Sequence, residues 1–382
     1  MANRHQFRTI EEMEKYFYGT GVAEIRKTDA PVLTDTTGVY QAVYGKMVWS
    51  WLNQEANAFG VLPKKPWDKS GWRVVTTRAA ASGGGVAETG SIPDTVKPTF
   101  AALSTNPKLI AHTFDVSEIA QAQAKSDDSI ADMAIMRKMI GIHHAEMMNI
   151  MLLTQSGTAA SNNLESIDRV TATYDEDTTC TENDGSTGYT AGDNDIYSQD
   201  RDAATTADSN CLNNNGTTRA LTLPLLDQLD QEVLEAGPAT PGQKIWLTGY
   251  DTLRVWAGLL QSQQRFMEVD FVKLGANGVQ TVPGRQAGFR VNSYMGYPII
   301  PSKNVVTDTT SAVEGISRVY LLDLAHLFLK VAKPTQYFEV GISSGDPWGP
   351  ALIGDEGMYR TMGELICTDF KSCGKLRDLK AS

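Results

Sequence analysis

The sequence predicts an α+β protein, in which a few helices are combined with mostly short strands. One long helical stretch lies near the middle of the chain, at 126–157. A helix, a buried strand and a second helix follow one another over 223–260. From about 289 onward, short segments rich in β-branched and aromatic residues are separated by turn-forming residues. This combination is typical of the α+β class.

The composition is that of a soluble globular protein, with 41% hydrophobic and 21% charged residues among 382. This length allows two or three domains. No apolar run approaches the roughly 18 residues of a membrane helix, and the first residues lack the apolar core of a signal peptide. We therefore expect neither a membrane span nor a secretion signal.

The first part of the chain, 1–70, reads as an N-terminal arm with a short helix near Ile10–Tyr18. The apolar and aromatic stretch Val39–Phe59 is compatible with a second helix. A core helix of a small N-terminal domain explains this stretch equally well.

Two strand-like segments follow, Trp72–Arg78 and Leu109–Val116, with a Gly- and Pro-containing stretch between them. This pattern predicts a long two-stranded hairpin with a flexible tip. A hairpin is marginal in isolation, so we expect it to lie against another molecule. The run Ser82–Gly85 is not followed by Gly-Lys-Ser/Thr, which favours a flexible loop over a phosphate-binding loop.

The long helix is predicted over Ser126–Gly157. Ser126 suits an N-cap, acidic residues occupy the first turn, and Gly157 is a natural stop. Its apolar side chains fall on one face at helical spacing: Ile130, Met133, Ile140, Met147 and Met151. Ordering such a backbone costs about 1–2 kcal/mol per residue, so the helix needs a sheet or other helices along that face.

The acidity of the protein is local. Twelve Asp and Glu residues against Arg169 and Arg201 give residues 156–216 a net charge of −10, out of −11 for the whole chain. This distribution argues against a basic nucleic-acid-binding surface. We expect a surface insertion with a solvated acidic face, because no window has the spacing of an EF-hand calcium loop.

The four cysteines are too few to hold the chain together. Cys180 and Cys211 flank the polar stretch, and a disulfide between these two residues is geometrically possible. Cys367 and Cys373 lie in a strand-like segment. If that segment is extended, they are about 20 Å apart, beyond the reach of a disulfide.

Regular structure returns at residue 222. Leu223–Glu235 is predicted to be an amphipathic helix, Lys244–Thr248 a buried strand, and a second helix begins at Asp251. Further strands are predicted at 289–294, 298–301, 319–322, 327–331, 337–340 and 365–370.

His143, His144 and Glu146 cluster in the long helix, but adjacent helical residues point about 100° apart and no HExxH motif accompanies them. Packing or solvent-exposed histidines are favoured over a metal site. Gly341–Gly345 matches the GxSxG motif with Ser343, but prolines follow where a nucleophile elbow requires a helix. We expect no catalytic residue, no metal and no cofactor.

The order of arm, hairpin, long helix and helix–strand–helix resembles the major capsid proteins of tailed double-stranded DNA viruses, which have the Hong Kong 97 fold. Several stretches are similar to that family. They are Leu223–Leu260, Gly296–Asn304, Val319–Asp323 followed by Leu327–Leu329, and Gly363–Asp369.

The resemblance implies six regions. They are an N-terminal arm (1–70), an extended hairpin loop (71–118), a peripheral domain with a spine helix (119–157), an acidic insertion (158–216), most of an axial domain (217–335) and a return to the peripheral domain (336–382). The extended loop would overlie a neighbouring subunit. Its candidate assembly contacts are Trp72, Arg78, Gly83, Gly84, Gly85, Pro93 and Lys97.

The resemblance also implies a function. Pentamers and hexamers of the chain would self-assemble into the icosahedral head of a phage and enclose double-stranded DNA without sequence-specific binding. It would be a virion protein assembled in the host cytoplasm, with portal, scaffold or decoration proteins as further partners. An encapsulin-type nanocompartment shell and a soluble serine hydrolase using Ser343 are the alternatives.

Overall fold

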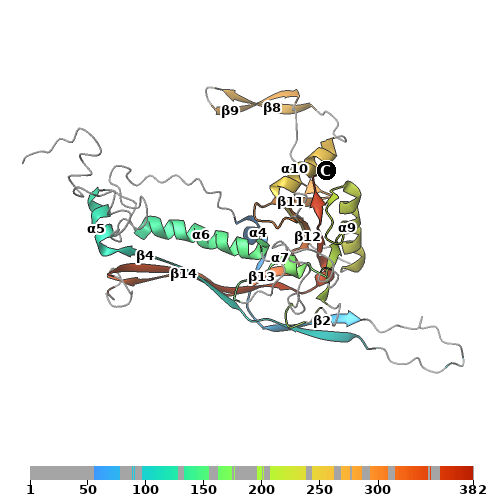
Figure 1. Ribbon diagram of the computed structural model, residues 1–382, viewed down its shortest axis with the longest axis horizontal. Helices are drawn as coiled ribbons and strands as arrows, with labels where there is room; N and C mark the ends of the chain where they lie inside the picture. The colour runs from blue at the N-terminus through green and yellow to red at the C-terminus, as the bar shows by residue number, and fades with distance from the viewer. Residues whose placement is uncertain are drawn as a thin grey trace, which may run out of the picture. The chain divides into compact units, whose positions relative to one another are not determined.

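The computed structural model describes a defined set of residues, drawn in colour in Figure 1. They are residues 56–77, 88, 90, 97–127, 133–154, 162–173, 176, 196–199, 201, 207–237, 243–261, 268–275, 278–285, 293–308, 315–342, 345 and 353–381.

The chain divides into two compact units. The first comprises residues 1–54, 111–144 and 335–360, and the second comprises residues 55–110, 145–334 and 361–382. Four elements contribute residues to both units: α6 (Met133–Thr154), β4 (Lys108–Ser117), β13 (Leu327–Gly341) and β14 (Gly354–Cys367). Among the described residues, no helix combines the length and apolar character needed to cross a membrane.

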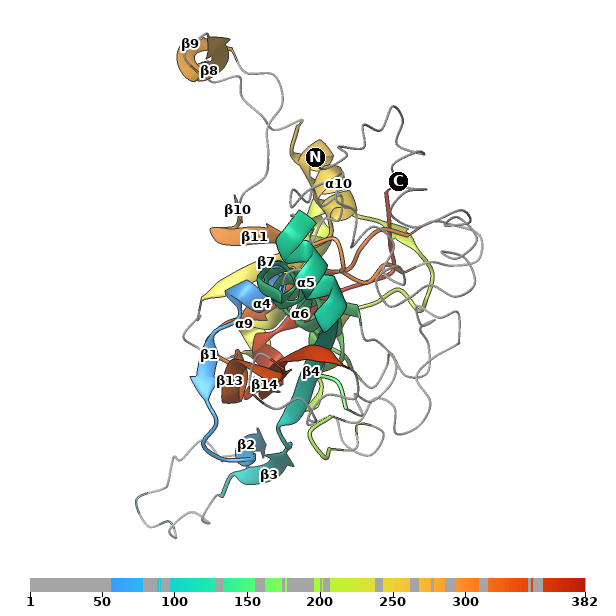
Figure 2. The same cartoon turned by 90° about the vertical axis from the view of Figure 1, so that its left-hand side faces the viewer.

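The first unit is built on neighbouring strands β13, β14 and β4, to which α5 (Glu118–Asp127) and the beginning of α6 are added (Figure 2). Alternate residues of the strands pack against the helices, because successive strand side chains point to opposite faces. The apolar core of this unit consists of Phe114, Val116, Ala120 and Met133, with Met136, Ile140, Tyr337 and Tyr359 at its edge. Gly141 permits close helix–strand packing, since a Cβ there would lie 3.2 Å from Tyr359 Oη.

The predicted start of the long helix is wrong. Ser126 and Asp127 lie in the last turn of α5, and the described part of α6 begins at Met133. The residues of α5 that precede Ser126 are rich in Ala and Gln, which are strong helix formers, so Ser126 lies inside a helix and not at its N-cap.

The second unit contains a six-stranded sheet in the order β10-β11-β7-β12-β15-β5. Its strands are β10 (Ser293–Tyr294), β11 (Tyr297–Pro301), β7 (Lys244–Thr248), β12 (Val319–Asp323), β15 (Gly374–Leu376) and β5 (Asn210–Leu212). Both faces of the two central strands are buried, and their side chains alternate between two apolar clusters. Trp246 and Leu321 face one cluster, whereas Ile245 and Tyr320 face the other.

Helices α9 (Leu223–Ala236) and α10 (Tyr250–Gln261) supply the first cluster, in which Trp246 and Trp256 meet edge to face with 5.5 Å between ring centroids. Residues from α4 (Asn57–Val61), α6 and α7 (Ile167–Val170) supply the second. The described end of the predicted arm therefore packs into a core, through Ala58 and Leu62.

Most of the helices and strands predicted after residue 222 are confirmed. Strand β7 has the predicted bounds, α9 and α10 are present, and the segments predicted at 327–331 and 337–340 join into the single strand β13. The segment predicted at 365–370 ends as a strand at Cys367, and η2 (Phe370–Ser372) follows.

The predicted hairpin has the wrong second strand. Strand β2 (Gly71–Thr77) pairs with β3 (Thr99–Ser104), while β4 joins the sheet β1-β13-β14-β4, in which β1 (Lys64–Pro66) is parallel to β13. Pro107 separates β3 from β4, and proline cannot donate to a strand ladder. Two further strand pairs were not predicted: β8 (Glu268–Gly275) with β9 (Gly278–Arg285), and β6 (Arg219–Ala220) with β16 (Leu379–Lys380).

Candidate interaction surface and buried ion cluster

The hairpin β2–β3 presents an exposed apolar pair. Val75 and Phe100 lie opposite one another in its antiparallel register, and they are 52% and 57% exposed. Trp72 and Val74 are instead partly buried against the core. Val75 of β2 and Phe100 of β3 thus form a surface suited to contact with another molecule, because burial of apolar surface is favourable by about 25 cal/mol per Å².

The root of this hairpin is held by Tyr197. Its ring meets that of Trp72 edge to face, with 5.1 Å between centroids, and its hydroxyl donates to the carbonyl oxygen of Leu365 at 2.7 Å. The backbone N–H of Ser104 donates to the carbonyl oxygen of Tyr197 at 3.0 Å. Burial raises the pKa of the Tyr197 hydroxyl well above its usual value, so it remains a hydrogen-bond donor.

The structure places only part of the predicted contact set. Trp72 lies at the hairpin root, partly buried, and Lys97 is exposed just before β3. Arg78, Gly83, Gly84, Gly85 and Pro93 lie outside the described residues. Sequence analysis missed Val75, Phe100 and Tyr197, although the alternation within β2 could have indicated Val75.

The predicted disulfide stays a prediction. Cys211 lies in β5, whereas Cys180 lies outside the described residues.

The expected solvated acidic face is wrong for the described residues of 158–216. Helix α7 is fully buried, and Ser166 caps it by accepting a hydrogen bond from the N–H of Arg169. Glu176 and Arg201 are also buried. Arg201 donates to the carbonyl oxygens of Arg169 at 2.7 Å and Ala207 at 2.9 Å. This part of the segment is a component of the core.

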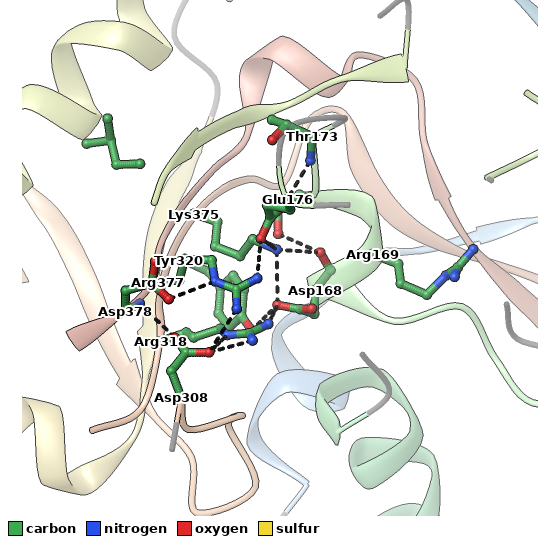
Figure 3. Close-up of polar contacts among 12 residues, drawn as sticks. Asp168, Arg169, Thr173, Glu176, Asp308, Arg318, Tyr320, Lys375, Arg377 and Asp378 are labelled. Atoms are coloured by element: carbon green, nitrogen blue, oxygen red, sulfur yellow. Dashed lines mark hydrogen bonds and ion pairs between the residues drawn. The ribbon is translucent and has the colours of Figure 1, made fainter. Parts of the chain in front are cut away.

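A buried ion cluster joins that segment to the six-stranded sheet (Figure 3). Four carboxylates meet three cations in it: Asp168, Glu176, Asp308 and Asp378 with Arg318, Lys375 and Arg377. The N–O distances are 2.6 Å from Arg318 to Asp168 and 2.5 Å from Arg318 to Asp308. They are 2.8 Å from Glu176 to both Lys375 and Arg377.

Each carboxylate of the cluster has at least one cationic partner, which lets the cluster persist out of water. Burial opposes ionisation of Asp168, but the charges of Arg318 and Lys375 outweigh that cost and hold its pKa well below the usual value. Tyr320 adds a hydrogen bond, donating to Asp168 Oδ1 at 2.8 Å. The ion pairs therefore hold Asp168 in its ionised form and in a fixed position.

The two histidines predicted to pack or to face solvent, rather than to bind a metal, lie beside a third histidine, His112. His144 is 2% exposed, and its Nδ1 is hydrogen-bonded to Nδ1 of His112, on β4, at 2.7 Å. Burial, and then the charge of His112, lower the pKa of His144 to about 4. Glu146 instead accepts a hydrogen bond from Lys303 at 3.1 Å. In the described part of the chain, no three His, Cys, Asp or Glu side chains are arranged to hold a metal ion.

Ser343, the nucleophile of the hydrolase hypothesis, lies outside the described residues, so that hypothesis stays a prediction. Strand β13 ends at Gly341, and the next described element is β14, its neighbour in the sheet.

No protein-family model and no curated protein matches the chain. Solved structures do match. The capsid of cyanophage A-1(L) has a TM-score of 0.58 at 15% identity, over 87% of this chain and 95% of that one. The capsid of the native GTA particle has a TM-score of 0.55 at 11% identity, over 87% and 93%. The capsid of the empty GTA particle has a TM-score of 0.53 at 12% identity, over 87% and 92%. The chain thus has the fold of these proteins, which confirms the predicted α+β, Hong Kong 97-like fold.

Proposed function

We propose that this chain, which has the same fold as the capsids of cyanophage A-1(L) and the GTA particle, is a structural shell protein that self-assembles into the head of a tailed double-stranded DNA virus. The observation that carries the proposal is the extent of the shared fold, since it covers most of both chains. A catalytic role is not part of the proposal.

The hairpin β2–β3 is the subunit contact that we propose. Val75 and Phe100 are exposed on one face of the hairpin, whereas Trp72 and Val74 pack against the core. One face of the hairpin is therefore anchored, and the other is available for contact. Each such contact is modest, but a closed lattice repeats it many times and the contributions add through multivalency.

The partners that we propose are copies of the chain itself, in pentamers and hexamers, around double-stranded DNA held without sequence-specific contacts. A net charge of −11 supports this, because a strongly basic protein would bind the phosphates tightly. Portal, scaffold and decoration proteins are further proposed partners. The proposed location is the virion, after assembly in the host cytoplasm.

The test is the assembly state of the full-length protein. We expect size exclusion and negative-stain microscopy to show capsomers or closed particles. A monomer or dimer under all conditions would overturn the proposal, and esterase activity lost in Ser343→Ala would support the hydrolase instead. Particles that package a protein cargo rather than DNA would favour the encapsulin-type shell.

The contact itself is tested by Phe100→Asp. We expect this variant to fold with an unchanged thermal midpoint but to lose particles, because a charge replaces an exposed apolar contact. The matched control Phe100→Leu should keep both the thermal midpoint and the particles. Normal particles from Phe100→Asp would exclude this hairpin face as a subunit contact.

A further inference from the structure

One face of α6 is apolar and exposed in the first half of the helix. Ile135, Met139 and Ile142 follow one another at spacings of four and three residues, which places them on one side of a helix. Met139 is 42% exposed and Ile142 is 44% exposed, while Ile135 is half-buried. We call these three residues the α6 stripe. Large apolar side chains gathered on one exposed face are typical of a surface that another segment covers.

The opposite side of α6 already has its partners. Met133 is buried in the apolar core of the first unit, and Met136 and Ile140 lie at the edge of that core. Arg137 forms an ion pair with Glu339 of β13, with an N–O distance of 2.5 Å. The α6 stripe is therefore not the face by which α6 joins the sheet of the first unit.

The face that carries the stripe is covered further along the helix. Glu146 and Asn149 continue its spacing, four and then three residues beyond Ile142. The side-chain oxygen of Asn149 accepts a hydrogen bond from the N–H of Phe59, in α4, at 3.1 Å. Asn149 is fully buried. The chain that forms α4 thus contacts α6 on the side of the stripe.

The segment before α4 lies outside the described residues, but its sequence has a matching apolar pattern. Four of its large side chains follow the same alternation of four and three residues: Tyr40, Tyr44, Met47 and Trp51. Two helices with this spacing can pack along a common seam, with the side chains of one between those of the other. Gly45 costs about 1 kcal/mol relative to alanine inside a helix, so this segment needs such a partner.

The length of the segment and the place where it ends also match the stripe. Asn149 and Ile135 are two heptads apart, which is about 21 Å along a helix. Residues 40–54 span the same distance when they are helical. Ala56, just before α4, is not helical (φ −131°, ψ 42°), so the chain can turn from one helix into the next. From the contact of α4 with Asn149, residues 40–54 therefore extend far enough to cover the whole stripe.

We propose that residues 40–54 form a helix that docks on the α6 stripe of the same chain. This helix runs in the same direction as α6, from the level of Ile135 toward Asn149, and the chain then enters α4. Burial of Met139 and Ile142 stabilises the docked helix, by about 25 cal/mol per Å² of apolar surface. The part of the arm that can reach another subunit is then residues 1–39. This last consequence rests on the proposed function, whereas the docking itself does not.

Residues 40–54 are favoured over two other occupants, the predicted helix near Ile10–Tyr18 and a second copy of the chain. Only Glu55 and Ala56 separate residues 40–54 from α4. Such a short tether keeps the entropy of loop closure small and the effective concentration at the stripe high. A segment further along the chain, or one from another molecule, loses more entropy on docking.

Hydrogen exchange of the full-length protein, followed by mass spectrometry, tests the docking. We expect the amides of residues 44–54 to be protected in the wild type. The double variant Met139→Asp, Ile142→Asp should lose this protection, because two charges replace the apolar contact. The amides of β7 and β12 should stay protected, which shows that the subunit is folded. If residues 44–54 of the wild type exchange at the rate of an unstructured peptide, the proposal is wrong.

Two control variants show whether the effect belongs to the stripe. Met139→Leu should keep the protection, because it preserves an apolar side chain of similar size. Ile119→Asp should also keep it, because Ile119 lies on α5, outside the stripe, and is 63% exposed. If the double variant does not fold, Met139→Ser takes its place. An equal loss of protection in Ile119→Asp would contradict docking at the stripe.

Cross-linking shows which chain supplies the helix. Lys46 lies in the segment, and Lys138 is exposed beside the stripe. An amine-reactive cross-linker should join these two lysines, and the joined peptide should come from the band of single-chain mass on a denaturing gel. A joined peptide found only in a band of twice that mass would assign the helix to a neighbouring copy. A link from Lys138 to Lys15 alone would assign the stripe to the helix near Ile10–Tyr18. Either result would overturn the proposal.

Discussion

At the scale of single residues, the ion cluster around Asp168 gives the largest expected effects. Asp168 faces both Arg318 and Lys375, with N–O distances of 2.6 and 3.3 Å, and all three side chains are fully buried. Removal of one member leaves an uncompensated charge without access to water. Such a group is sensitive to the loss of any one partner.

We therefore expect Asp168→Asn to lower the free energy of unfolding by about 3–5 kcal/mol. Glu339→Gln is the control, because the ion pair of Glu339 with Arg137 is partly exposed and is expected to contribute about 1 kcal/mol or less. Urea denaturation measures both variants. Equal losses of stability in the two variants would show that burial of the cluster does not determine its contribution.

His144 gives a pH dependence whose sign follows from its pKa. The pKa is about 4 in the folded protein, through burial and the neighbouring His112, against a usual value of 6.5. Between these values the unfolded chain binds a proton that the folded chain does not, so stability falls as the pH falls from 6.5 to 4. The loss by pH 4 is about 3 kcal/mol.

Urea denaturation of the wild type and His144→Gln between pH 8 and pH 4 measures this dependence. The difference in stability between the two proteins should be constant above pH 7 and should shrink below pH 6.5, because the variant lacks the titrating group. A difference that stays constant across the whole range would assign the acid sensitivity to other residues.

At the scale of elements, the hairpin β2–β3 combines an anchored root with an exposed pair. Its root contacts Tyr197, Trp72 and Ser104 all lie outside the segment 83–93. We expect deletion of 83–93 to leave a folded subunit with an unchanged circular dichroism spectrum, because the anchoring contacts remain. Closed particles should be lost, because the deletion shortens the proposed intersubunit loop.

Electron microscopy of the deletion variant checks this prediction. A loop of the same length, in which 83–93 is replaced by Gly and Ser, distinguishes the role of length from that of sequence. Intact particles from the deletion variant would contradict the proposed role of the loop.

The sequence predicted elements better than it predicted their pairing. Helix α9 and strand β7 were found because their periodicity and end signals are local. The partner of β2 was not predicted, since β3 and β4 are both strand-like and only residues 105–107 separate them. The turn at η2 was missed because no strong sequence signal marks it.

At the scale of the whole molecule, the order of elements was enough to predict the fold, but the location of charge was misjudged. The acidic segment contains only two cations, Arg169 and Arg201, and a local count therefore suggested a solvated face. Three further cations come from sequence positions more than a hundred residues away: Arg318, Lys375 and Arg377. The partners of a charged group are the residues that lie close to it in the folded chain, and the local amino-acid composition does not show which these are.

The position of β15 has a consequence for the synthesis of the chain. This strand comes from the last tenth of the sequence, yet it lies between β12 and β5 in the six-stranded sheet. Until residues 374–377 have left the ribosome, β5 lacks β15, its neighbour among the described strands, and Glu176 lacks Lys375 and Arg377. The six-stranded sheet therefore cannot be completed until residues 374–376 have left the ribosome.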